Sequence, residues 1–113
     1  MSRTPRQASF DILDCINFAM ESTSRIETLE EFVVSTNVYY AILYMHIRIA
    51  EATRLIPDRL KQLFPEIVWD DIIRLRDIIV HYYWQINPLA IWHVTKFSLP
   101  KLEDSINQLL EQL

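Results

Sequence analysis

The chain contains no glycine among its 113 residues, and this absence limits what it can fold into. Glycine supplies the positive φ angles that tight β-hairpin turns need, so such hairpins are disfavoured. Glycine-rich loops that cradle phosphate groups are also impossible, which excludes nucleotide sites of the Walker and Rossmann kinds. A chain built mainly from helices is the economical interpretation.

Helix signals begin at once in the first half of the chain. Thr4-Pro5 is typical of an N-cap followed by proline, and apolar residues then recur with a 3.6-residue period to about Ser22. Thr28 and Glu31 match a capping box for a short helix through Val34. A long helix is expected from the Ser35–Asn37 cap to Ile56, where Pro57 ends it, with a brief helical turn before Phe64.

The second half follows the same pattern. Trp69-Asp70-Asp71 is expected to begin a central helix, and no glycine or proline interrupts it before Pro88. Asn87-Pro88 predicts the next helix, through Phe97, and Ser98-Leu99-Pro100 kinks or restarts it before a final apolar stripe to Leu113. We therefore expect an all-α, antiparallel bundle of four to five helices, with residues 1–113 forming one domain.

The composition limits where the protein is expected to be located and what it is expected to bind. No apolar run approaches the ~20 residues of a membrane span, and the N-terminus has no signal-peptide core. The single cysteine, Cys15, argues against a disulfide framework, so we expect a cytoplasmic protein. The net charge of −4 argues against a generally basic nucleic-acid binder, but eight arginines leave room for a local basic cleft.

The central helix carries an unusual set of polar residues, namely Arg76, Asp77, His81 and Tyr83, inside an apolar run. On an ideal helix, Asp77 and His81 are i,i+4 neighbours, so the carboxylate can accept a hydrogen bond from the imidazole. Arg76 and Tyr83 fall on one face, whereas Arg76 and His81 lie about 140° apart around the axis. Arg76 and His81 share a site only if Arg76 reaches around, the helix is distorted near its end, or a second chain completes the site.

This last possibility, together with apolar residues on more than one face of the same helix, predicts a homodimer. The polar residues of this helix can also be explained by purely structural roles. By spacing alone, His81 is more often a core or interface histidine, and Arg76 can simply pair with Asp77 or Glu51. The three histidines lack any metal-ligand spacing, so no metal or other cofactor is expected.

Further features surround this motif at characteristic spacing: Pro65-Glu66-Ile67-Val68-Trp69 before it, Trp92 and Leu99-Pro100 after it, and Ala50-Glu51-Ala52 upstream. With the Arg-x4-His-x-Tyr motif, they resemble the HepT-like toxin family of the HEPN superfamily of helical ribonucleases. The chain departs from the family pattern at Arg74 and Tyr82, where the family often has glycine and aspartate.

The resemblance implies a toxin that cleaves RNA without a metal, through the ribose 2′-hydroxyl. Arg76 and His81 would be catalytic, and Asp77, Tyr83 and Glu51 would support them. The family's partner is a minimal nucleotidyltransferase antitoxin that transfers AMP to the motif tyrosine, which is Tyr83 here. The alternative is a non-catalytic helical module that docks a nucleotidyltransferase or a nucleotide.

Overall fold

The computed structural model describes residues 2–113, and every regular element in this part of the chain is helical. In chain order the elements are α1 (Pro5–Ser22), α2 (Leu29–Val34), α3 (Thr36–Thr53), α4 (Asp58–Lys61), α5 (Trp69–His81), the 3-10 turn η1 (Tyr83–Gln85), α6 (Pro88–His93), the π-helical turn η2 (Val94–Ser98) and α7 (Leu99–Leu110). The prediction of an all-α chain is confirmed. Each of these helices is too short or too polar to span a lipid bilayer.

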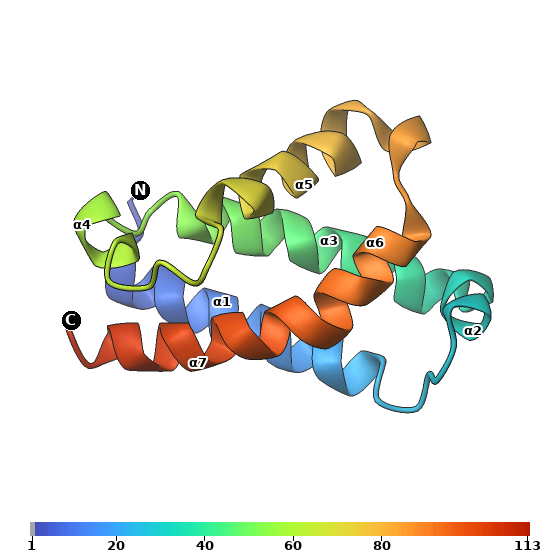
Figure 1. The fold of residues 1–113 in the computed structure, drawn as a ribbon, viewed down its shortest axis with the longest axis horizontal. Helices are drawn as coiled ribbons and strands as arrows, with labels where there is room; N and C mark the ends of the chain where they lie inside the picture. The colour runs from blue at the N-terminus through green and yellow to red at the C-terminus, as the bar shows by residue number, and fades with distance from the viewer. Residues whose placement is uncertain (1) are drawn as a thin grey trace.

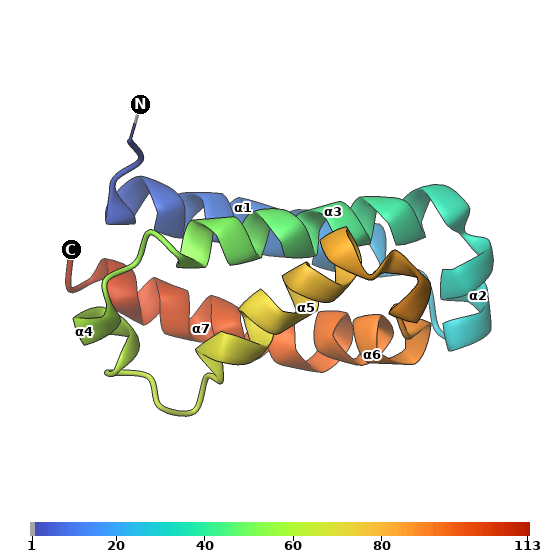
Figure 2. The same ribbon diagram turned by 90° about the horizontal axis from the view of Figure 1, so that it is seen from above.

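Helices α1, α3 and α5 and the continuous segment α6–η2–α7 run alternately in opposite directions, as the sequence predicts for an antiparallel bundle (Figure 1). Helix α3 lies between α1 and α5, and α1 also packs against α7. The short helices α2 and α4 close opposite ends of the bundle, and the two termini lie at the α4 end (Figure 2). Helix α5 runs obliquely and rests mainly on α3.

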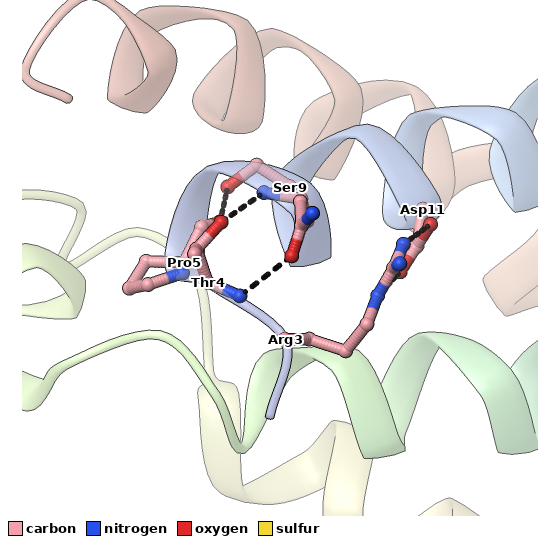
Figure 3. A network of polar contacts seen from close by, with 6 residues as sticks. Arg3, Thr4, Pro5, Ser9 and Asp11 are labelled. Atoms are coloured by element: carbon pink, nitrogen blue, oxygen red, sulfur yellow. Dashed lines mark hydrogen bonds and ion pairs between the residues drawn. The ribbon is translucent and has the colours of Figure 1, made fainter. Parts of the chain in front are cut away.

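The start of α1 shows how local sequence fixes a helix end (Figure 3). Gln7 N donates to Thr4 Oγ1 over 3.1 Å, and Thr4 N donates to Gln7 Oε1 over 2.9 Å, which forms a capping box. The Arg3 guanidinium forms an ion pair with the Asp11 carboxylate, eight residues later in the chain. The distance from Arg3 Nη2 to Asp11 Oδ1 is 2.6 Å. The predicted bounds of this helix, from the Thr4-Pro5 cap to Ser22, are confirmed.

The turns between helices use no left-handed backbone. Among residues 2–113, no residue has a positive φ angle, which agrees with the absence of glycine. Two predicted helix ends differ from those observed. Helix α3 ends at Thr53 rather than Ile56, because residues 54–56 already turn toward Pro57. Helix α5 ends at His81, because the chain must reverse direction before the Asn87 cap of α6.

The core lies between α1, α3 and α7. Its fully buried side chains come largely from these helices and include Ile12, Ile16, Ile42, Ile49, Ile106 and Leu109. Cys15 is buried among them, and burial raises the pKa of its thiol, as suits a structural residue. In α5 only Ile79 is buried, and the other apolar side chains of this helix stay partly or fully exposed. The bundle therefore leaves its central motif helix incompletely covered.

His46 is a buried polar residue that joins α3 to η2. Its Nε2 lies 3.0 Å from the hydroxyl of Thr95, and that hydroxyl donates its single proton to the Ile91 carbonyl over 2.8 Å. The hydroxyl must therefore accept from His46, which places the imidazole proton on Nε2. Burial disfavours the charged ring and lowers the pKa of His46 from 6.5 to about 4.

We predict that this histidine makes the fold sensitive to acid. The unfolded chain takes up a proton on His46 near pH 6.5, whereas the folded chain does so only near pH 4, so stability falls across this window. The loss reaches up to about 3 kcal/mol, because each pKa unit corresponds to about 1.4 kcal/mol. Urea unfolding between pH 7 and pH 4 measures it. His46→Gln keeps a donor for Thr95 but does not titrate, so its stability should fall less; equal pH dependence in both proteins would contradict the prediction.

Candidate functional site: an Arg–His pair at the end of α5

Arg76 is the centre of a cluster of charges between α3 and α5. Its Nε lies 2.9 Å from Glu51 Oε1, although the N–H does not point at that oxygen and the contact is ionic rather than a hydrogen bond. Its Nη1 donates to Asp77 Oδ1 over 3.1 Å. The side chain is only 23% exposed, while both carboxylates are about half exposed. The two carboxylates thus orient a guanidinium that is partly shielded from water.

Arg54 completes this cluster from α3. Its Nε lies 3.8 Å from Glu51 Oε1, and its Nη2 lies 4.0 Å from Asp77 Oδ1. The contact with Glu51 joins residues three apart in the chain, whereas the approach to Asp77 joins residues that lie far apart in the sequence. Two arginines and two carboxylates therefore balance one another. Within residues 2–113, Arg76 Nη2 makes no hydrogen bond, so this end of the fork has hydrogen-bonding capacity left for an anion.

His81 lies at the exposed last residue of α5 and meets Arg76. The distance from Arg76 Nη1 to His81 Nε2 is 3.4 Å. A guanidinium has no acceptor, so Nε2 must offer its lone pair and the ring proton must sit on Nδ1. At this length the bond is weak, and the lone pair remains available to a stronger donor. The ring therefore has the form that a general base requires.

Arg76 and His81 meet within one chain, although an ideal helix would place their side chains about 140° apart. Arg76 reaches around the helix, and α5 ends at His81, so a second chain is not needed to bring the pair together. Of the explanations that the sequence leaves open, the first is the one observed. This geometry consequently removes one argument for a dimer and leaves the exposed apolar face of α5 as the other.

Asp77 does not hold His81 in the manner that the i,i+4 spacing suggests. Within the described chain its carboxylate makes no hydrogen bond to the imidazole, and Oδ1 accepts from Arg76 instead. A guanidinium is a stronger partner for a carboxylate than a neutral imidazole is, because both groups are charged. Asp77 is thus linked to His81 through Arg76, which contacts both side chains.

Tyr83 does not share a helix face with Arg76, so that expectation is wrong. Tyr82 leaves helical geometry at φ −135° and ψ 48°, and Tyr83 begins η1. Its side chain is 71% exposed and packs edge-to-face against Trp84 at 5.4 Å between ring centroids. It makes no hydrogen bond to Arg76 or His81 among residues 2–113. The phenol is therefore accessible to solvent near the motif.

A cavity of about 420 Å³ lies between α5 and α7, and it is not this site. Its apolar walls include Ile72, Leu75 and Ile78 from α5 and Leu99 and Leu102 from α7. None of Arg76, Asp77, His81, Tyr83 or Glu51 lines it. In the part of the chain that the structure describes, no group of three or more His, Cys, Asp or Glu side chains is arranged to hold a metal ion.

The fold and site define a small helical bundle with an Arg–His pair at the exposed end of a helix. The family model described as "Ribonuclease HepT-like" matches residues 12–109. The chain belongs to this HepT-like ribonuclease family, which places it among enzymes that cleave RNA and confirms the resemblance found in the sequence.

Three relatives match over nearly their whole length. A protein named as a probable ribonuclease HepT, from Thermococcus cleftensis, is 29% identical over 96% of this chain and 98% of its own. A protein named as a candidate RNase from Methanocaldococcus jannaschii is 30% identical over 86% of this chain and 88% of its own. One named likewise from Caldanaerobacter subterraneus is 26% identical over 97% of both chains. No solved structure matches the chain significantly.

Proposed function

We propose that the chain is the toxin of a type VII-like toxin–antitoxin pair and acts as a metal-independent endoribonuclease. Arg76 and His81 are its catalytic residues, and Glu51, Asp77 and Tyr83 support them. The observation that carries the proposal is the 3.4 Å contact between Arg76 Nη1 and His81 Nε2 at an exposed helix end. Residues 1–113 form one HEPN-like unit, and the protein acts on RNA in the cytoplasm.

The proposed reaction is an attack of the ribose 2′-hydroxyl on the adjacent phosphorus. The Nε2 lone pair of His81 accepts the proton of that hydroxyl as the new P–O bond forms. Arg76 stabilises the negative charge that builds on the non-bridging oxygens. The imidazolium then returns a proton to the leaving 5′-oxygen as the P–O bond to it breaks. The products are a 2′,3′-cyclic phosphate and a 5′-hydroxyl.

Glu51 and Asp77 set the conditions under which phosphate binds. Both carboxylates contact Arg76 in the free chain, so an RNA phosphate must join or displace them. Arg76 Nη2, which makes no hydrogen bond in the described chain, offers the first point of contact, and Arg54 supplies a second positive charge nearby. We propose that the carboxylates orient the guanidinium and that phosphate binds to the face they leave open.

We predict that His81→Ala lowers RNA cleavage by about 10²–10⁴-fold, the usual contribution of a general base. His81 is exposed, so the helical fold should persist by circular dichroism. Arg76→Lys should also be poorly active, since lysine keeps the charge but loses the fork. Cleavage is measured in EDTA by the appearance of cyclic-phosphate ends.

The matched control is His93→Ala, which removes another exposed histidine, packed against Phe97 on α6 and η2. It should cleave RNA like the parent. Parental activity in His81→Ala would refute the catalytic assignment. A parent that binds but does not cleave RNA in EDTA would favour the non-catalytic binding module.

We further propose that the protein is a homodimer through the outer face of α5. Val80 is exposed there, and Ile73 is only half-buried. An apolar surface of this kind on a small bundle is typical of an interface. His81 follows Val80 directly and is exposed at the end of α5, so a second copy on this face would bring two Arg–His pairs near each other.

Light scattering should give twice the 13.5 kDa of one chain at micromolar concentration. Val80→Glu places a charge in the proposed interface and should shift the mass toward the monomer. Val34→Glu, which changes an exposed valine on α2, should remain dimeric. A monomeric parent that retains cleavage would rule out the dimer.

We propose that a nucleotidyltransferase antitoxin neutralises the toxin by transferring AMP to the Tyr83 phenol. The support is the position of Tyr83, two residues after His81 with 71% of its side chain exposed. Each transferred AMP adds a phosphodiester with one negative charge, which would compete with RNA phosphate for Arg76. Inhibition would then be both electrostatic and steric.

Intact-mass analysis after incubation with antitoxin and ATP tests this step. The parent and Tyr82→Phe should gain mass in units of AMP, and Tyr83→Phe should not. The cleavage activity that Tyr83→Phe shows alone should not fall when the antitoxin and ATP are added. A mass gain on Tyr83→Phe that disappears in Tyr82→Phe would assign the modification to the other tyrosine.

A further inference from the structure

The turn after α5 exposes three aromatic side chains in succession. Tyr82, Tyr83 and Trp84 are 48%, 71% and 66% exposed. The other two tryptophans have packing roles: Trp69 Nε1 donates to the Lys61 carbonyl over 3.1 Å, and Trp92 packs against Phe32 with ring centroids 5.0 Å apart. Trp84 is exposed to a degree that no packing role in the bundle accounts for.

The rings of this turn hold one another in place. Tyr82 and Trp84 pack edge-to-face at 5.8 Å between centroids, and Tyr83 and Trp84 do so at 5.4 Å. Such contacts fix the orientation of the indole while most of its surface remains exposed. An aromatic ring that is already oriented loses little conformational freedom when another flat ring stacks on it.

The turn also lies beside the catalytic pair. Trp84 follows His81 by three residues, which span at most about 11 Å of extended chain. A phosphate held at Arg76 therefore brings the bases of its neighbouring nucleotides within reach of the indole. Residues 82–86 contain no carboxylate that would repel the RNA backbone.

We propose that Trp84, braced by Tyr82 and Tyr83, is a stacking subsite for an unpaired nucleobase next to the scissile phosphate. This inference rests on the proposed ribonuclease function and specifies its substrate as single-stranded RNA. Exposed aromatic rings beside a phosphate-binding cation are the arrangement by which proteins bind single strands, and every base offers a face for stacking. The subsite is therefore tolerant of sequence but requires a base that is free of a duplex.

Tryptophan fluorescence tests the stacking without any need for cleavage. A short single-stranded RNA with 2′-O-methyl riboses cannot be cleaved through the 2′-oxygen, and it should quench the parent. Trp84→Leu should lose this quenching, because Trp69 and Trp92 are partly buried and packed against other parts of the bundle. Phe18→Leu, which changes an aromatic residue of α1 that is 47% exposed, should be quenched like the parent. Equal quenching of Trp84→Leu and the parent would overturn the proposal.

Cleavage kinetics supply the second measurement. Trp84→Leu should raise KM for single-stranded RNA about tenfold and change kcat less, and Trp84→Phe should restore part of the affinity. An RNA with abasic nucleotides on both sides of the cleaved bond should give the parent and Trp84→Leu the same KM. Unchanged KM for Trp84→Leu on normal RNA would refute stacking while leaving the ribonuclease intact.

Light scattering tests whether the aromatic turn is instead an interface between two copies of the chain. If Trp84→Leu dissociates a dimeric parent, the aromatic turn is an interface between copies rather than a base-binding site, and the proposal fails. If the parent cleaves no RNA yet is quenched through Trp84, the proposed function fails while the subsite stands.

Discussion

The packing of α3 between α1 and α5 is the constraint on which the structure depends. One side of α3 supplies buried residues such as Ile42 and Ile49 to the core. Another side carries Glu51, whose Oε1 lies 2.9 Å from Arg76 Nε on α5. Since α5 rests mainly on α3, this ion pair and the half-buried residues around Ile79 fix where the motif helix lies. The Arg76–His81 pair is thus held in place from a neighbouring helix.

Because α5 ends at His81, the site is held by its helix and is also open to solvent. Had the helix continued through Trp84, His81 would lie inside it, and Arg76 would have to reach a side chain surrounded by another turn. The end at His81 instead leaves the imidazole exposed, within 3.4 Å of Arg76 Nη1. It also places the aromatic residues of η1 beside the pair. In the proposed reaction, adjacent parts of one short segment would hold a substrate phosphate and the base next to it.

Much of the fold could be predicted because its signals are local. The Thr4 cap, the Asn87-Pro88 start of α6 and the restart of α-helix after Ser98 depend on residues within one helical turn of each other, and all three are observed. The end of α5 could not be predicted in this way. Tyr82, Tyr83 and Trp84 contain no helix breaker, and the helix stops because the chain must return across the bundle to α6.

The sequence by itself determined the helical class, most helix starts and the identity of the motif residues, since these follow from residue type and short spacing. Tertiary structure alone decided how the motif is arranged. It paired Arg76 with Glu51 across 25 positions of the chain, brought Arg54 near Asp77, and turned Tyr83 off the helix face that its spacing suggests. Periodicity describes an ideal, isolated helix, whereas side-chain partners and helix ends depend on which neighbouring helices the folded chain brings into contact.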